Sequence, residues 1–336
     1  MRSVLIGPGA IGGTLATLIT EAGFQLDVVD KDEASAKKLS EEGFHLIGAR
    51  GEHRVKLHTI PSLEALEGQY DICIIATKYF FMPDLAGKML PYLKEDSIVV
   101  AMQNGICIDM LADVVGKNRA VGCMIGFGAT MTALGEVNMT SKGEFIIGMS
   151  EGYSSDKLEY FKKMMDSVLP TAITDNIVGA LYSKLIINSC INSLGAATGK
   201  TLGEVLKHLQ ARNIFLAIAR EGISVAKKMG LKVPPYNGIL EYRMLLVSNA
   251  AFYNSIVKTL FRLIGSLKYG KVKVSMLQSL ERGEKTEIDI FNGYIARKGK
   301  EVGVPTPVND QITQMIKDIE TGKRPIAVSN LNDIKL

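Results

Sequence analysis

A glycine-rich segment at the start of the chain constrains its fold more than any other feature. The apolar run Val4–Ile6 precedes Gly7-Pro8-Gly9-Ala10-Ile11-Gly12, and a helix-compatible run over 14–21 follows. This order of strand, G-x-G-x-x-G and helix is the context that a dinucleotide-binding motif requires. Its glycines permit a tight turn, the approach of a pyrophosphate and close packing of the helix on the strand. We therefore predict that residues 7–12 bind a dinucleotide; the alternative is a turn that serves packing alone.

The end of the next expected strand, 24–30, bears on which dinucleotide binds. Asp30 lies about 18 residues after Gly12, near the offset at which an acidic residue binds the ribose 2′-hydroxyl of NAD. Lys31 follows directly and offers a positive charge to the 2′-phosphate of NADP. Asp30 favours NAD, whereas Lys31 favours NADP. The remaining alternative is that both are solvated turn residues.

Strands and helices alternate through the first half of the chain. The expected helices are 32–42 and 82–93, and the expected strands are 71–77, 97–102 and 120–127, with short strands within 45–60. Continuous apolar runs such as 71–77 are typical of parallel strands that are buried on both faces. We therefore predict an α/β doubly wound sheet of the Rossmann type. Lys78 follows the strand 71–77, at the carboxyl end where such sheets bind ligands.

The pattern changes after residue 135. Short antiparallel strands are expected at 135–137 and 144–148, then a helix over 155–167 and a last strand at 170–175. Beyond 176 helical periodicity dominates, with long helices expected at 177–197, 205–229 and 287–303. We therefore predict two domains, a dinucleotide-binding domain over 1–175 and a mostly α-helical domain over 176–336 for substrate binding and dimerisation.

Composition narrows the class of protein. A net charge of +4 is small for 336 residues and argues against a nucleic-acid-binding protein. The four cysteines have neither C-x-x-C spacing nor histidines at ligand spacing, so we expect no disulfide framework and no metal site. The chain enters its first strand without a signal peptide, and no uncharged apolar run reaches membrane-spanning length. We expect a cytoplasmic protein that does not contact membranes.

A row of polar residues marks the expected helix 177–197. Lys184, Asn188 and Asn192 are spaced i, i+4 and i+8, so they share one helix face. Burying an ammonium and two amides within an apolar segment is costly unless they have partners, and a polar ligand would supply them. The alternative is an amphipathic stripe that faces water.

Glu287 is the third candidate, and its local sequence is less specific. It starts the expected helix 287–303, where a first-turn acid is favoured by the helix dipole whether or not it has a function.

Several motifs in order make the chain resemble the ketopantoate reductase (2-dehydropantoate 2-reductase) family over nearly its full length. They are Gly7-Pro8-Gly9-Ala10-Ile11-Gly12, Thr77-Lys78, Gln103-Asn104-Gly105, Tyr182 with Lys184, Asn188 and Asn192, Glu221 with Gly230, Ser275-Met276-Leu277-Gln278, Thr286-Glu287-Ile288-Asp289 and Pro305-Thr306-Pro307. A set of separate motifs in the right order is far more specific than any one of them.

The resemblance implies hydride transfer from a nicotinamide to the ketone of a 2-oxo acid. It assigns Lys184 as general acid and Glu287 as a catalytic residue that also helps to bind substrate and lies at the cofactor. It places Asn188, Asn192 and Ser275 at the substrate, and Asn104 and Lys78 in the cleft near the cofactor. The implied reaction is reduction of 2-dehydropantoate to pantoate, as in pantothenate biosynthesis.

Three matters stay open at this point. The family usually has arginine at the position of Lys31, which favours NADP(H) over NAD(H). The alternatives to a ketopantoate reductase are a reductase of another 2-oxo acid and a protein that senses NADP(H) without catalysis. The apolar segment 239–267 is expected to be helical and predicts a homodimer through the second domain.

Overall fold

A computed structural model describes residues 1–235 and 273–336 of the chain. They form two compact units, Met1–Leu181 and Tyr182–Leu336. The division falls within one long helix, whereas the sequence placed the boundary at residue 175. The segment 239–267, with its expected helices and dimer contact, lies outside the described residues.

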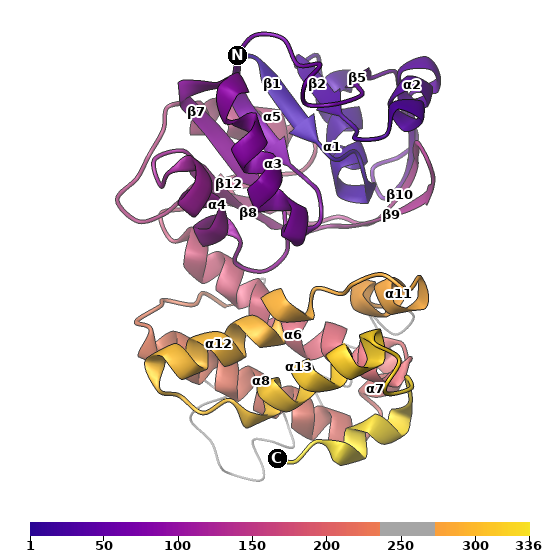
Figure 1. The fold of residues 1–336 in the computed structure, drawn as a ribbon, viewed down its shortest axis with the longest axis vertical. Helices are drawn as coiled ribbons and strands as arrows, with labels where there is room; N and C mark the ends of the chain where they lie inside the picture. The colour runs from indigo at the N-terminus through magenta and orange to yellow at the C-terminus, as the bar shows by residue number, and fades with distance from the viewer. Residues whose placement is uncertain (236–272) are drawn as a thin grey trace. The chain divides into compact units, whose positions relative to one another are not determined.

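The first unit is built on an eight-stranded sheet (Figure 1). Its strands are β1 Ser3–Ile6, β2 Leu26–Val29, β5 His58–Ile60, β6 Tyr70–Ile75, β7 Leu93–Ala101, β8 Ala120–Ile125, β11 Phe145–Met149 and β12 Thr171–Ile173. The order β5-β2-β1-β6-β7-β8 is parallel throughout and is that of a dinucleotide-binding sheet. The predicted Rossmann-type sheet is therefore confirmed.

The two strands beyond β8 depart from the parallel pattern. β11 pairs antiparallel with β8 and parallel with β12 at the edge. A second sheet of order β4-β3-β10-β9 contains β3 Phe44–Gly48, β4 His53–Val55, β9 Gly128–Ala133 and β10 Glu136–Ser141. The expected strands 135–137 and 144–148 thus fall in different sheets, in β10 and β11, and each has one antiparallel and one parallel neighbour.

Five helices accompany these sheets among the described residues of the first unit. They are α1 Ala10–Glu21, α2 Glu33–Glu42, α3 Met82–Met89, α4 Ile108–Val115 and α5 Lys157–Asp166, with the 3₁₀ turns η1 Tyr79–Phe81 and η2 Leu90–Tyr92. α3 lies along β6 and β7, and α4 along β7 and β8, while α1 contacts strands of both sheets. The helix α1 is therefore buried along most of its length.

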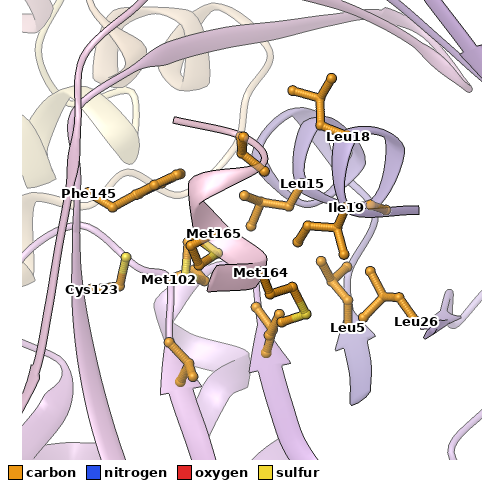
Figure 2. Packing of buried hydrophobic residues seen from close by; sticks show 14 of the residues in the cluster. Leu5, Leu15, Leu18, Ile19, Leu26, Met102, Cys123, Phe145, Met164 and Met165 are labelled. Atoms are coloured by element: carbon orange, nitrogen blue, oxygen red, sulfur yellow. The ribbon is translucent and has the colours of Figure 1, made fainter. Parts of the chain in front are cut away.

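The core of this unit lies between the large sheet, α1 and α5 (Figure 2). Alternate residues of the parallel strands β1, β2, β6, β7 and β8 point into it, because side chains on a strand alternate between the two faces. Figure 2 shows strand residues Leu5, Cys123 and Phe145 together with Leu15, Leu18 and Ile19 of α1 and Met164 and Met165 of α5. The strand residues between them are buried against the opposite face, which explains the continuous apolar runs of the sequence.

Where the structure describes it, the second unit is helical. Its elements are most of α6 Ile177–Thr198, then α7 Leu202–Val205, α8 Leu209–Lys228, α11 Ser275–Glu281, η3 Ile288–Ile290, α12 Asn292–Val302, α13 Pro307–Glu320 and η4 Val328–Asp333. α8, α12 and α13 contact one another pairwise (Figure 1). The half-buried carboxylate of Glu221 on α8 accepts hydrogen bonds from the backbone N–H groups of Val308 and Asn309, at 2.9 Å each, and so caps α13.

Two of the helices predicted for this unit begin later than expected. The expected helix 205–229 is interrupted at residues 206–208, where α7 ends and His208 forms the N-cap of α8. The expected helix 287–303 is η3 followed by α12, which begins only at Asn292. The predicted start at residue 205 was four residues too early, and the prediction of a single helix over 287–303 was wrong. Apolar spacing continues through the turns before α8 and α12, which explains both differences.

Within residues 1–235 and 273–336, one helix, α6, is long and apolar enough to cross a membrane. However, 72% of its most apolar window is buried inside the structure, as in the core helix of a soluble protein. Tyr182 shows why, since its ring is fully buried and its hydroxyl donates to the Gly222 carbonyl of α8 at 2.9 Å. We therefore treat α6 as a core helix.

An ion cluster joins elements at the amino ends of β1 and β6. The carboxylate of Asp71 accepts a hydrogen bond from the backbone N–H of Arg2 at 2.9 Å. It also lies 2.9 Å from the Lys94 ammonium and 3.3 Å from that of Lys157, which is itself buried. Burial opposes the ionisation of Asp71, but these bonds outweigh it and lower its pKa to about 2.

This cluster predicts acid-sensitive stability. Because the folded pKa of Asp71 is about 2 and an unfolded aspartate has a pKa of about 3.9, its contribution is complete above about pH 4 and is lost as the pH falls toward 2. Asp71→Asn is expected to lower the free energy of unfolding near neutral pH by roughly 2 kcal/mol. Urea unfolding near pH 7 and pH 3 measures the effect, which should fall to about half at pH 3, because that pH lies between the two pKa values.

A matched control is Asp84→Asn on α3, which breaks an exposed ion pair with Lys88. Exposed pairs of this kind contribute about 0.5 kcal/mol or less. If Asp71→Asn is no more destabilising than Asp84→Asn near neutral pH, the cluster does not stabilise the fold.

Candidate functional site

The glycine loop between β1 and α1 has the geometry that a pyrophosphate requires. Gly7 has φ of +90°, and a Cβ there would lie 2.5 Å from Thr77 Cγ2. A Cβ on Gly12 would lie 2.1 Å from the Gly7 carbonyl oxygen, so both positions exclude a side chain. At Gly9, by contrast, an added Cβ would meet no atom within 4 Å. The loop is therefore tight at its two ends and open at its centre, which fits a phosphate group approaching the backbone.

The helix α1 begins at the loop itself. Its first turn contains Ala10, Ile11 and Gly12, four residues before the run that the sequence suggested. The first N–H groups of a helix have no partners within the helix, and they carry the positive end of its dipole. The loop thus offers backbone donors as well as space.

A second group of predicted residues follows β6 and β7. Thr77 and Lys78 lie directly after β6, the neighbour of β1, and Asn104 lies after β7. The strand order reverses between β1 and β6, and open α/β sheets bind ligands at such a point. The structure therefore brings the glycine loop and Thr77-Lys78 to the carboxyl ends of two adjacent strands.

Gln103 holds these strand ends together, a role that the sequence did not assign. Its side-chain Nε2 donates to the carbonyl oxygens of Ile75 and Thr77, at 2.8 and 3.0 Å. The side chain is 5% exposed, so it is a buried brace between the end of β7 and the segment that carries Lys78. The sequence offered only the motif Gln103-Asn104-Gly105 as a signal. The hydrogen-bond partners of the Gln103 amide become visible only in the fold.

The residues after β2 adopt a defined turn. Asp30 Oδ1 accepts a hydrogen bond from the backbone N–H of Asp32 at 3.2 Å. Asp32 in turn caps α2, accepting from the backbone N–H of Ser35 at 2.8 Å. Lys31 is exposed, and its ammonium lies 5.3 Å from the centre of the Phe81 ring. These contacts define an ordered turn, and the binding of a cofactor by Asp30 and Lys31 stays a prediction.

In the second unit the predicted polar row lies on α6. Lys184 and Asn188 are half-buried, and Asn192 is 6% exposed. The Asn192 Oδ1 accepts from Ser275 Oγ at 3.1 Å, at the start of α11. A stripe facing water would leave all three side chains exposed, and the burial of Asn192 does not agree with that alternative. The structure thus joins two predicted substrate-binding residues that are 83 positions apart.

Glu287 lies just before η3, in a segment tied to α13. The neighbouring Thr286 N–H donates to Glu320 at 2.7 Å, and Asp289 lies 2.6 Å from the Lys317 ammonium. Because α12 starts only at Asn292, Glu287 is not a first-turn acid of that helix. Its side chain is half-buried, so the fixed segment presents a carboxylate that solvent reaches in part.

Cysteines and metal ligands offer no competing site in the described ranges 1–235 and 273–336. Cys73, Cys107, Cys123 and Cys190 are buried free thiols. Within the same ranges, no three His, Cys, Asp or Glu side chains come together as metal ligands do.

Comparison with known proteins agrees with this geometry. Residues 4–152 match the family model described as ketopantoate reductase PanE/ApbA, and residues 176–320 match the model of its C-terminal part. The 2-dehydropantoate 2-reductase of Pyrococcus abyssi is 29% identical over 332 residues, covering 95% of this chain and 98% of that protein. The enzyme of the same name from Aquifex aeolicus is 26% identical over 325 residues, with 94% and 96% covered.

Solved structures show the same fold. A ketopantoate reductase of the PanE/ApbA family from Ralstonia eutropha JMP134 has a TM-score of 0.81 at 23% identity, covering 96% of this chain and 99% of that one. D-mandelate dehydrogenase, solved with NADH and anilino(oxo)acetate, has a TM-score of 0.79 at 22% identity, with the same coverage. With both halves matched in order, the chain belongs to the ketopantoate reductase family of NAD(P)H-dependent 2-oxo-acid reductases.

Proposed function

We propose that this protein reduces 2-dehydropantoate to pantoate with NADP(H), in the cytoplasm, as a step of pantothenate biosynthesis. The observation that carries the proposal is the polar row of α6, in which Asn192 is bonded to Ser275 within an otherwise apolar helix. The relatives from Pyrococcus abyssi and Aquifex aeolicus, named 2-dehydropantoate 2-reductases, support this substrate.

The residues divide the chemistry between binding and proton transfer. When bound, the reduced nicotinamide supplies a hydride to the ketone carbon. The Lys184 ammonium donates a proton to the ketone oxygen and stabilises the negative charge that develops there. Asn188, Asn192 and Ser275 bind the polar groups of the substrate. Glu287 positions the substrate and contacts the cofactor.

Other residues hold the cofactor. The loop of residues 7–12 binds the pyrophosphate through backbone N–H groups. Lys78 and Asn104 line the cleft near the nicotinamide, with Gln103 bracing the segment that carries Lys78. Lys31 meets the 2′-phosphate that distinguishes NADP from NAD, while Asp30 faces the ribose from the same turn.

A second candidate is the reduction of a different 2-oxo acid. It is favoured by the likeness to D-mandelate dehydrogenase, whose solved complex contains NADH and an aryl-substituted oxoacetate. An NADP(H)-sensing protein without catalysis is the third, but it has no need of an ammonium placed to protonate a ketone.

Steady-state oxidation of NADPH distinguishes these candidates. We expect turnover with 2-dehydropantoate to exceed that with phenyl-substituted and short-chain 2-oxo acids in kcat/KM. Higher kcat/KM for another 2-oxo acid would favour the second candidate. Tight binding of NADPH without turnover of any 2-oxo acid would favour the third candidate, a protein that senses NADP(H) without catalysis.

Lys184→Ala tests the proton donor. We expect kcat to fall by roughly 10²–10⁴-fold, because general acids contribute that much, with little change in the Kd for NADPH. The matched control is Lys207→Ala, which removes an exposed lysine of the same unit and should leave kcat unchanged. A Lys184→Ala variant that keeps most of its turnover would exclude Lys184 as the proton donor.

We also propose a homodimer, from the apolar content of residues 239–267. A solved relative at 18% identity and a TM-score of 0.73 is described as the dimeric ketopantoate reductase of Staphylococcus aureus. Sedimentation at micromolar concentration should give twice the monomer mass. A monomer under those conditions would contradict the proposal.

A further inference from the structure

Lys31 and Phe81 approach each other from two separate strand ends. Lys31 follows β2 and Phe81 closes the turn after β6, and these strands flank β1 on either side. The Lys31 ammonium lies 5.3 Å from the centre of the Phe81 ring, within the range of a cation–π interaction. The contact therefore lies on the edge of the sheet where the glycine loop also lies.

The Phe81 ring is exposed and nevertheless firmly placed. Phe80 and Phe81 are 36% and 47% exposed, which is unusual for two large apolar side chains in succession. Edge-to-face contacts connect them to the buried ring of Tyr79, with centroid distances of 5.3 Å for Tyr79–Phe80 and 4.5 Å for Phe80–Phe81. The Phe81 N–H also donates to the Lys78 carbonyl at 3.1 Å. This series of contacts fixes a ring that contributes little to the core.

The neighbouring acid does not pair with Lys31. The Asp30 carboxylate accepts from the backbone of Asp32, inside its own turn. Within the described ranges, Lys31 forms no ion pair at 4.0 Å or less. The pKa of the Asp32 carboxyl is lowered mainly by its bonds to Ser35 and in smaller part by the charge of Lys31, so this carboxylate acts on the ammonium without forming an ion pair. The Phe81 ring is the side-chain contact that the structure gives for the Lys31 ammonium.

We propose that Phe81 is a positioning residue for cofactor selection, acting through Lys31. This inference rests on the proposed use of NADP(H). In this fold the end of β2 lies at the adenosine ribose, where NADP carries its extra phosphate. A lysine is a flexible point charge, so a ring that restricts its side chain reduces the ordering needed when the phosphate binds. An ammonium has three N–H donors, and contact with the ring face leaves donors for a phosphate.

The test compares dissociation constants of NADPH and NADH for the full chain, by fluorescence titration without substrate. Phe81→Leu is expected to raise the Kd of NADPH by about two- to fivefold, the size of an exposed cation–π contact, and to leave that of NADH unchanged. Phe81→Tyr keeps an aromatic face and should restore the parent values. In a Lys31→Met background, Phe81→Leu should have no further effect, because the partner is gone.

A matched control is Leu90→Ala, which removes another exposed apolar side chain, 37% exposed in η2, and should change neither constant. If Phe81→Leu raised the Kd values of NADPH and NADH by the same factor, the inference would be overturned, since the ring would then contact a part that the two cofactors share. Additive effects of Phe81→Leu and Lys31→Met, or an unchanged NADPH-to-NADH ratio, would overturn it too.

Failure of the proposed reaction gives a different result. A chain whose NADPH-to-NADH ratio depends on Phe81 as expected, but which reduces no 2-oxo acid, refutes the reaction and supports the role of Phe81. If the protein reduces a 2-oxo acid but its NADPH-to-NADH ratio of dissociation constants does not change with Phe81→Leu, the proposed reaction is supported and the role of Phe81 is refuted.

Discussion

The close approach of β1, α1 and β6 is the constraint on which the nucleotide-binding unit depends. Gly7 and Gly12 lie so near Thr77 and each other that a methyl group at either position would collide. This approach places the first turn of α1 at the end of β1. Of the three glycines of the motif, Gly9 is the one where an added Cβ would meet no atom within 4 Å. The close position of α1 on β1 and the open centre of the loop therefore both depend on the absence of side chains at Gly7 and Gly12.

Satisfaction of buried polar groups organises the helical unit in a comparable way. Asn192 is nearly inaccessible on an apolar helix, and its bond to Ser275 fixes the start of α11 beside α6. Glu221 does the same between α8 and α13, where burial raises the pKa of its carboxyl despite the donors it binds. Because an unpaired buried polar group is costly, such pairs favour one arrangement of helices over alternatives with similar apolar packing.

Sequence reasoning succeeded where the signal was local. Continuous apolar strands and the glycine loop predicted the parallel sheet, because both follow from the conformations of neighbouring residues. It failed at residues 206–208 and 287–291, where apolar spacing continues across the turns, and only the Thr201–Glu204 capping box hinted that α7 is a separate short helix. Contacts such as Asn192 with Ser275 and Lys31 with Phe81 join residues far apart in the chain, so no local pattern contains them.

The positions of the four cysteines allow local unfolding of the two units to be observed chemically. All four thiols are buried, and burial raises the pKa of those of Cys73 and Cys190. A buried protonated thiol reacts slowly with alkylating reagents, since the thiolate is the reactive form. Cys73, Cys107 and Cys123 belong to the nucleotide-binding unit, and Cys190 belongs to the helical unit. Alkylation followed by peptide mapping therefore reports the opening of each unit separately, with the native side chains as probes.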